Sequence, residues 1–375
     1  MSESVKKSKR ILTFDLLRGY FMVSIILNHL HWYPNGLDWV AARGSLFVSA
    51  AEGFFFISGI VLGIIRGRKL IDVPFRKAAL LLLNRGVVLY VTSIVLMLIF
   101  TFIGWFFLGN PGLKPGIRPI DESLLSILAG ALSMNYIYGW ADFLRLYSVF
   151  LIASPFALLL LRKNKWAPLM VISLAIWGLF PLAKAMGSAS PELLMLLSWQ
   201  FIFFAGMTLG FYWDVLAEKW RGLSKKLRKA ILTPVLGIAA VTLVVNIILV
   251  AVPLLGLPGA SGVDAFHSSL WPLFQKHALS PLRLVLFGLW FILGFYLFNR
   301  YEAPIKKYVG WILLPFGQNS LYVYIMHAVI LFFAHLIIAP GAGSGLLVNA
   351  IGSIIVLALI YVAVKTKFLF KIIPR

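Results

Sequence analysis

Three ionisable residues in two apolar segments have the types and spacing that could do chemistry. The run LLRGYFMVSIILNHLHWYP, residues 16–34, carries Arg18 near one end and His29 near the other, and SLFVSAAEGFFFISGIVLGIIRGRK carries Glu52. An imidazole beside a carboxylate is a ready general base, because the carboxylate orients the ring and stabilises its protonated form. A guanidinium binds anionic groups through several parallel hydrogen bonds. The two segments therefore predict a His29–Glu52 base with an anion-binding Arg18 some distance away.

Helical rotation places these residues on two polar stripes. At about 100° per residue, Asp15, Arg18 and His29 fall within about 60° of one another, and a rise of about 1.5 Å per residue puts His29 roughly 16 Å beyond Arg18. A second stripe with the same spacing rule contains Glu52, Gly59, Gly63 and Arg66. The Gly59–Gly63 pair permits close approach of another helix. We expect His29 to face Glu52, with both arginines nearer the cytoplasm.

The composition indicates that these segments lie in a membrane. Apolar residues make up 61% of the 375 positions, charged residues 13%, and the mean hydropathy is +0.93. A soluble chain of this length would need far more charge on its surface. Apolar runs long enough to cross about 30 Å of hydrocarbon recur throughout. The predicted spans are 14–31, 45–65, 79–107, 142–161, 167–185, 194–213, 230–255, 281–299, 313–337 and 345–364, with a short re-entrant or interfacial helix at 123–135.

The formal charge of +21 is a topology signal. Most of the 34 Lys and Arg residues fall in alternate loops, namely 1–10, 66–77, 162–165, 219–229, 300–307 and 365–375, whereas the other loops hold Arg43, Lys114, Arg118, Lys184 and Lys276. Basic residues mark the cytoplasmic side. We therefore predict one all-α membrane domain over residues 1–375, a bundle of about ten transmembrane helices with both termini cytoplasmic. The Gly- and Pro-rich loops 108–141 and 256–280 then lie outside, where they could cover a site.

Further polar residues within the spans are functional candidates because each is costly in lipid unless paired or hydrated. Arg18, Arg66, Arg85 and His327 suit an anionic co-substrate, while Arg145, Gln200 and Asn319 are candidates for substrate binding. Several of these residues can also be explained by a purely structural role. Asp15 and Arg18 also fit a simple ion pair, Arg66 a topology anchor, and His327 and His335 interhelical hydrogen bonds. Glu52 has fewer structural uses.

The two opening segments also carry a family resemblance. FDLLRGYFMVSIILNHL followed by SAAEGFFFISGIVLGIIRG resembles the start of the OpgC-type membrane acyltransferases, relatives of the acyltransferase-3 group. The similarity continues in order through RGVVLYV, LRLYSVFLIASPFALLLLRK, WQFIFFAGMTLGFYW and FGQNSLYVYIMHAVI, and so covers most of the chain.

The resemblance implies a function. OpgC-type proteins are associated with succinyl groups on periplasmic glucans, and the wider group moves acyl chains from a cytoplasmic thioester to sugars outside. It implies His29 as the catalytic base, Glu52 as its partner, and Arg18, Arg85 and His327 as donor-binding or supporting groups. The expected co-substrate is succinyl-CoA or acetyl-CoA, the acceptor an extracytoplasmic glycan, and the location the bacterial inner membrane. Direct transfer and an acyl-His intermediate both stay open.

Other function classes are compatible with the residues alone. A proton-coupled transporter could use the same His, Glu and Arg residues as a relay, although no internal repeat is evident. A glycan polymerase or ligase with lipid-linked donors would need charged clusters in a large outer loop. The basic residues do not form a soluble nucleic-acid-binding face, and with no cysteine the chain has no thiol chemistry. We expect a lipid bilayer as surroundings, no metal, and leave a homodimer open.

Overall fold

The computed structural model is a helical bundle and describes residues 11–187, 191–341 and 344–374. The predicted basic segment 1–10 and Arg375 lie outside these residues. All regular elements in the described part are helical: α1 (Leu12–Leu30), α2 (Asp38–Ala41), η1 (Ala42–Gly44), α3 (Ala50–Leu62), η2 (Gly63–Arg68), α4 (Phe75–Trp105), α5 (Leu124–Leu132), α6 (Asp142–Arg162), α7 (Trp166–Gly178), α8 (Phe180–Ala185), α9 (Pro191–Phe211), α10 (Trp213–Gly222), α11 (Lys225–Leu254), α12 (Ala260–Leu270), η3 (Trp271–Phe274), α13 (Pro281–Arg300), α14 (Glu302–Tyr308), α15 (Gly310–Gln318), α16 (Ser320–Ile337) and α17 (Leu346–Lys365).

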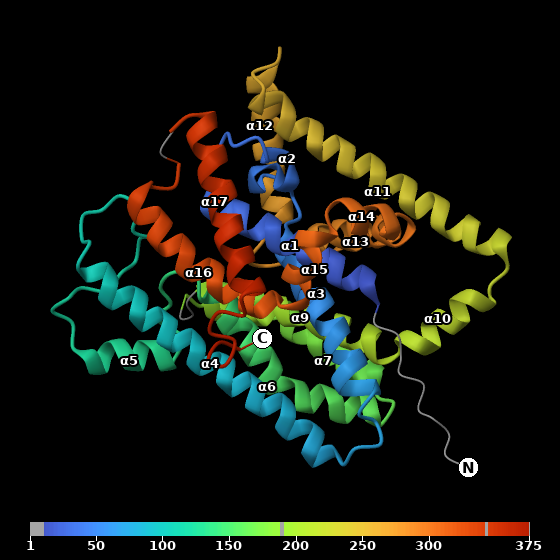
Figure 1. The fold of residues 1–375 in the computed structure, drawn as a ribbon. Helices are drawn as coiled ribbons and strands as arrows, with labels where there is room; N and C mark the ends of the chain where they lie inside the picture. Colours follow the sequence, from blue (N-terminus) through green and yellow to red (C-terminus); the bar gives the residue numbers. More distant parts are fainter. Residues whose placement is uncertain (1–10, 188–190, 342–343, 375) are drawn as a thin grey trace.

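The membrane-spanning architecture is confirmed. Within the described residues, nine helices or helix pairs are long and apolar enough to cross a bilayer. Helix α1, with 19 residues, carries Asp15 and Arg18 and is not among these nine; we assign it as the tenth crossing from its place in the bundle. Its centre is buried by α3, α13, α15 and α16 (Figure 1). The predicted short helix is α5, which has nine residues and cannot span.

Two predicted spans are interrupted. The span at 313–337 is broken at Asn319, whose backbone is non-helical and whose amide donates to the Pro315 carbonyl oxygen at 3.0 Å. A side chain that binds a nearby carbonyl competes with the helical hydrogen bonds there. The span at 167–185 is divided between α7 and α8, where Pro181 occupies the first turn of α8. Hydropathy alone does not register either break.

Glycines bring the functional helices close together. A Cβ atom at Gly59 would overlap the Phe203 carbonyl oxygen, and one at Gly63 would overlap that of Met207, so α3 and η2 lie directly on α9. This confirms the close approach predicted from the Gly59–Gly63 spacing. Gly19 of α1 meets the backbone of Leu313 of α15 in the same way. These contacts fix the positions of the polar stripes on α1 and α3.

The periphery is apolar and faces lipid. Helix α11 runs along the edge of the bundle between α12 and α10 (Figure 1), and only 17% of its most apolar window is buried inside the protein. Side chains such as Val244, Ile248 and Val91 are about half exposed. In water such a surface would drive aggregation, whereas in a bilayer it is solvated by hydrocarbon.

Candidate active site

A chamber of about 240 Å³ lies at the outer end of α1; we call it the outer chamber. Its lining includes Asn28, His29, Arg43, Ser49, Phe143, Lys276, Arg283 and Tyr324. Among these described lining residues there are three cations and no carboxylate. The chamber therefore favours anionic groups and a developing negative charge.

His29 is held by a second histidine. Its Nδ1 lies 3.0 Å from Nε2 of His327, and Nδ1 of His327 bonds the Tyr324 carbonyl oxygen. A carbonyl only accepts, so His327 carries its proton on Nδ1 and, when neutral, accepts at Nε2 from His29. This arrangement assigns the proton of His29 to Nδ1. Nε2 of His29 then keeps its lone pair, as a general base requires.

The loop before α6 stacks an indole on the imidazole. The rings of His29 and Trp140 have centroids 4.1 Å apart and are inclined by 15°. Lys114 bonds the Gly139 carbonyl at 2.9 Å and lies 4.2 Å from the Trp140 ring centroid. Residues of both Gly- and Pro-rich outer loops thus border the site, because Trp140 comes from one and Lys276 from the other.

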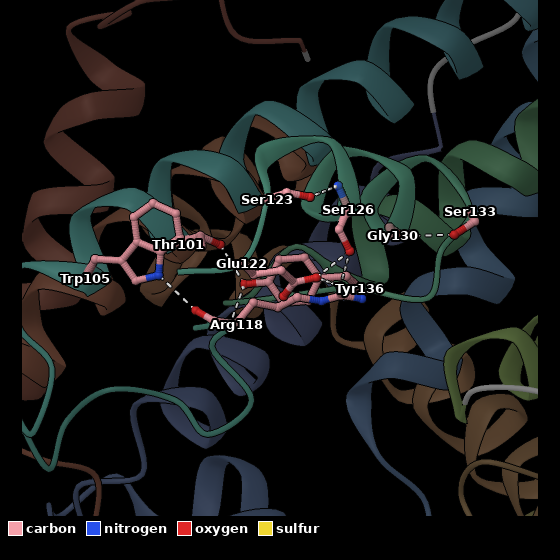
Figure 2. Close-up of polar contacts among 9 residues, drawn as sticks. All are labelled: Thr101, Trp105, Arg118, Glu122, Ser123, Ser126, Gly130, Ser133 and Tyr136. Carbon is pink, nitrogen blue, oxygen red and sulfur yellow. Dashed lines mark hydrogen bonds and ion pairs between the residues drawn. The ribbon is translucent and has the colours of Figure 1, made fainter. Parts of the chain in front are cut away.

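A polar network holds the loop that carries Trp140 (Figure 2). The Thr101 hydroxyl and Tyr136 hydroxyl are 2.7 Å apart, and Trp105 donates to the Arg118 carbonyl at 2.9 Å. Arg118 pairs with Glu122. Arg145 is fully buried and donates to the carbonyls of residues 131 and 136, each at 3.0 Å. Arg145, predicted to bind substrate, therefore braces this loop.

Glu52 is completely buried and binds an arginine that the sequence reading did not single out. Oε1 accepts from Nε of Arg283 at 2.5 Å and from a second guanidinium nitrogen. Oε2 accepts from the backbone and hydroxyl of Ser49. The structure therefore does not form the predicted direct His29–Glu52 hydrogen bond. Glu52 lies behind the chamber wall, and Arg283 and Ser49 stand between it and the cavity.

The physical reason is the position of the helix start. The predicted span begins at residue 45, but α3 begins at Ala50, so Glu52 is the third helical residue. Ser49 and Glu52 form a capping box, in which each side chain satisfies the other's free backbone N–H. The Ser-x-x-Glu spacing is visible in the sequence and could have been recognised. The role of Glu52 in catalysis stays a prediction.

Lys276 and Arg283 are two charged site residues that sequence reasoning missed, as it missed Trp140. Arg283 is 1% exposed in the first turn of α13, where it also donates to the Phe274 carbonyl at 3.0 Å. The Lys276 ammonium lies 5.6 Å from the Phe143 ring centroid. Burial lowers the pKa of Lys276, with Arg283 acting in the same direction and Glu52 against it. A basic residue beside an outer helix end was the only sequence signal for either.

A second hollow of about 410 Å³, the inner cavity, lies at the other end of α1. It brings together three of the arginines predicted to bind the co-substrate, Arg18, Arg66 and Arg85, and adds Lys69. The carboxylates Asp15 and Asp214 belong to the same lining. Arg18 also donates to the Ser320 hydroxyl. Arg66 lies on the single π-helical turn η2, a distortion that often occurs at functional sites. His327, the fourth predicted residue, lies beside His29 instead.

The comparison with known proteins is decisive for the family. A family model described as OpgC protein matches residues 10–372. The chain belongs to the OpgC family. This confirms the resemblance predicted from the opening motifs, and OpgC membership indicates a glucan-modifying membrane acyltransferase. No curated protein and no solved structure matches the chain.

Two further candidates of this OpgC protein are not part of the lining of either hollow. Gln200 is 6% exposed and joins α9 to α7 through the Ser173 hydroxyl at 2.6 Å and the Ser173 carbonyl at 2.7 Å. Asn319 forms the break between α15 and α16, between Gln318 and Ser320, which both line the inner cavity. Neither lines the outer chamber or the inner cavity, and their part in substrate binding stays a prediction.

Proposed function

We propose that this OpgC protein moves an acyl group of the succinyl or acetyl type from cytoplasmic acyl-CoA to a hydroxyl of an extracytoplasmic glycan, in the bacterial inner membrane. The observation that carries the proposal is the placement of two side chains on one helix. His29 lines the outer chamber and Arg18 lines the inner cavity, about 16 Å apart along α1 at about 1.5 Å per residue.

The inner cavity supports the donor side. Four basic residues, Arg18, Arg66, Lys69 and Arg85, and two carboxylates, Asp15 and Asp214, line it on the side of the basic loops. The lining is net positive, and planar guanidinium groups suit phosphate oxygens. A nucleotide headgroup bound there would remain in the cytoplasm. A long, thin arm reaching along α1 would carry its thioester toward His29 without the whole donor crossing the membrane.

The reaction follows from the proton positions at His29. Nε2 of His29 accepts the proton of the acceptor hydroxyl as its oxygen bonds to the thioester carbonyl carbon. The carbon–sulfur bond then breaks, and the departing thiolate takes that proton from His29. The products are an ester and free coenzyme A. His327 supports the protonated intermediate state because its Nε2 accepts from Nδ1 of His29.

Lys276 is our candidate for stabilising the negative charge on the carbonyl oxygen. It lines the same chamber as His29. Arg283 is occupied by Glu52 and Arg43 by Asp38, to which it bonds at 2.5 Å. Lys276 has no carboxylate bonded to it within the described chain, so its ammonium is the cation best able to turn toward a new anion.

The proposal is tested with purified protein in sealed proteoliposomes, with succinyl-CoA or acetyl-CoA on the side of the inner cavity and a glucan on the other side. We expect ester formation with release of coenzyme A, and a loss of about 10²–10⁴-fold for His29→Ala. The exposed His31 is the matched control, and His31→Ala should retain activity. Full transfer by His29→Ala would contradict the mechanism. Solute flux without acyl transfer would support the transporter alternative.

A further inference from the structure

A third hollow of about 240 Å³ adjoins the outer chamber and has no part in the chemistry proposed above. We call it the lateral groove. It is bordered by Phe21 and Ser24 of α1, Leu243 of α11, and Trp290, Gly294 and Leu297 of α13. Its described lining contains no Asp, Glu, Lys, Arg or His.

Three polar side chains of the groove wall, Tyr20, Ser24 and Trp290, already have hydrogen-bond partners within the protein. The hydroxyls of Tyr20 and Ser24 both donate to the Val40 carbonyl, at 2.9 and 3.3 Å. The Trp290 indole donates to the Thr242 hydroxyl at 3.0 Å. A ligand in the groove is therefore offered apolar surface, which favours hydrocarbon over a sugar or a phosphate.

The groove lies directly beside the outer chamber. Both hollows share the wall residues Asn28, Gly44, Leu46, Ser49 and Ala50. From Leu17 to Asn28 the groove follows α1 for about 16 Å. A molecule that fits both spaces has a polar head beside His29 and an apolar chain directed toward the middle of the membrane. That combination is an amphiphile.

The groove is accessible from the surrounding membrane. Leu297 at its inner end is 40% exposed. The flanking helix α11 lies at the edge of the bundle (Figure 1). A water-sized chemical group occupies about 30 Å³, so the volume of the groove, about 240 Å³, accommodates about eight such groups. This is the scale of a segment of one hydrocarbon chain, which can enter sideways from the bilayer.

We propose that the lateral groove binds the hydrocarbon chain of a membrane-anchored acceptor, whose sugar head presents its hydroxyl in the outer chamber. This inference rests on the proposed acyl transfer and adds the class of acceptor, a lipid-linked or alkyl-linked glycan. Sideways entry also explains how an acceptor reaches a chamber of only about 240 Å³ that outer loops border.

Two glycines of α13 provide a matched pair of variants. A Cβ atom at Gly294 would meet nothing within 4 Å and would project into the lateral groove. Gly288 lies on the same helix and is equally open, but it borders a different hollow formed with Phe56 and Leu209. Gly294→Phe should fill the groove and Gly288→Phe should leave it open. Leu243→Trp fills it from the opposite wall.

The binding test uses a decyl β-glucoside with a photoreactive group at the end of its chain, with the protein in nanodiscs. Peptide mapping should place the label on α1 and α13 near Leu17 and Phe298, which line the inner end of the groove. We expect Gly294→Phe and Leu243→Trp each to reduce this label at least tenfold, with Gly288→Phe unchanged. Equal labelling in all four proteins, or labelling elsewhere, would overturn the proposal.

The activity test separates this inference from the proposed function. Wild type and Gly288→Phe should acylate decyl glucoside with a kcat/KM at least tenfold above that for free glucose, and Gly294→Phe should lose this preference. Equal rates on both acceptors would remove the groove from acceptor binding while acyl transfer stands. Groove labelling without any transfer would contradict the proposed function and leave the chain-binding site in place.

Discussion

Nδ1 of His29 and Nε2 of His327 lie 3.0 Å apart, although the two residues are 298 positions apart in the chain. The Tyr324 carbonyl accepts from Nδ1 of His327, so Nε2 of His327 accepts the proton on Nδ1 of His29. Nε2 of His29 is then unprotonated and faces the outer chamber. His29, the base predicted from sequence, is therefore oriented by the imidazole of His327. Glu52, its predicted partner, lies behind the wall of the outer chamber and binds Arg283 instead.

Replacing His327 should impair chemistry more than binding. In His327→Ala the His29 proton is free to move to Nε2, which removes the base, so we expect kcat to fall about 10²-fold or more with little change in the donor KM. The kcat of His327→Gln should be at least tenfold higher than that of His327→Ala, because the amide oxygen of glutamine can accept from Nδ1 of His29. Steady-state kinetics check this. Equal defects in both variants would mean that His327 only fills space.

Lys276 should set an alkaline limb in the pH profile. Burial lowers its pKa, so the ammonium is lost at a lower pH than for an exposed lysine. If the charged form stabilises the oxyanion, kcat falls as the pH rises through that lowered pKa. Lys276→Arg should remove this limb, because guanidinium stays charged, and Lys276→Met should lower kcat about 10²–10³-fold. An unchanged limb in Lys276→Arg would exclude Lys276 as its source.

The buried Glu52–Arg283 pair should matter for stability. Each partner is almost fully buried, so Arg283→Met alone leaves an uncompensated carboxylate and should destabilise by about 3–5 kcal/mol. The double variant Glu52→Gln with Arg283→Met should recover most of this loss. Thermal or denaturant unfolding in detergent is the measurement.

The partly exposed Arg118–Glu122 pair is the control for that experiment. Glu122→Gln should leave the unfolding temperature almost unchanged, because solvent screens exposed pairs. A similar loss at both sites, or no recovery in the double variant, would contradict the assignment of stability to the buried pair.

The inner cavity should govern donor affinity. Arg18→Gln, Arg66→Gln and Arg85→Gln should each raise the KM for acyl-CoA about 10–100-fold, since a hydrogen bond to a charged group contributes about 1.5–3 kcal/mol. Arg300 is basic, exposed and outside the cavity lining, so Arg300→Gln is the control. Direct binding of acyl-CoA that is unchanged in all three variants would place the donor elsewhere.

Much of the fold could be predicted because the signals are local. Crossing a bilayer depends on the summed transfer free energy of about 20 consecutive residues, so the spans are visible without knowledge of their neighbours. The close packing of α3 on α9 follows from Gly59 and Gly63 in the same way. The helix start at Ala50 was also local, but the prediction passed over the Ser49–Glu52 capping box and placed Glu52 too deep in its helix.

The composition of the site was a different matter. The sequence by itself determined that this is a membrane protein and in what order its helices cross the membrane. It also singled out His29 and the arginines near the cytoplasmic side as candidate site residues. Only the tertiary structure decided that His29 pairs with His327, that Glu52 pairs with Arg283 across 231 positions, and that Trp140 and Lys276 border the site. Hydropathy sums over neighbours in the chain, whereas these pairings depend on how separate helices are placed side by side, and that placement is set by packing between segments hundreds of residues apart.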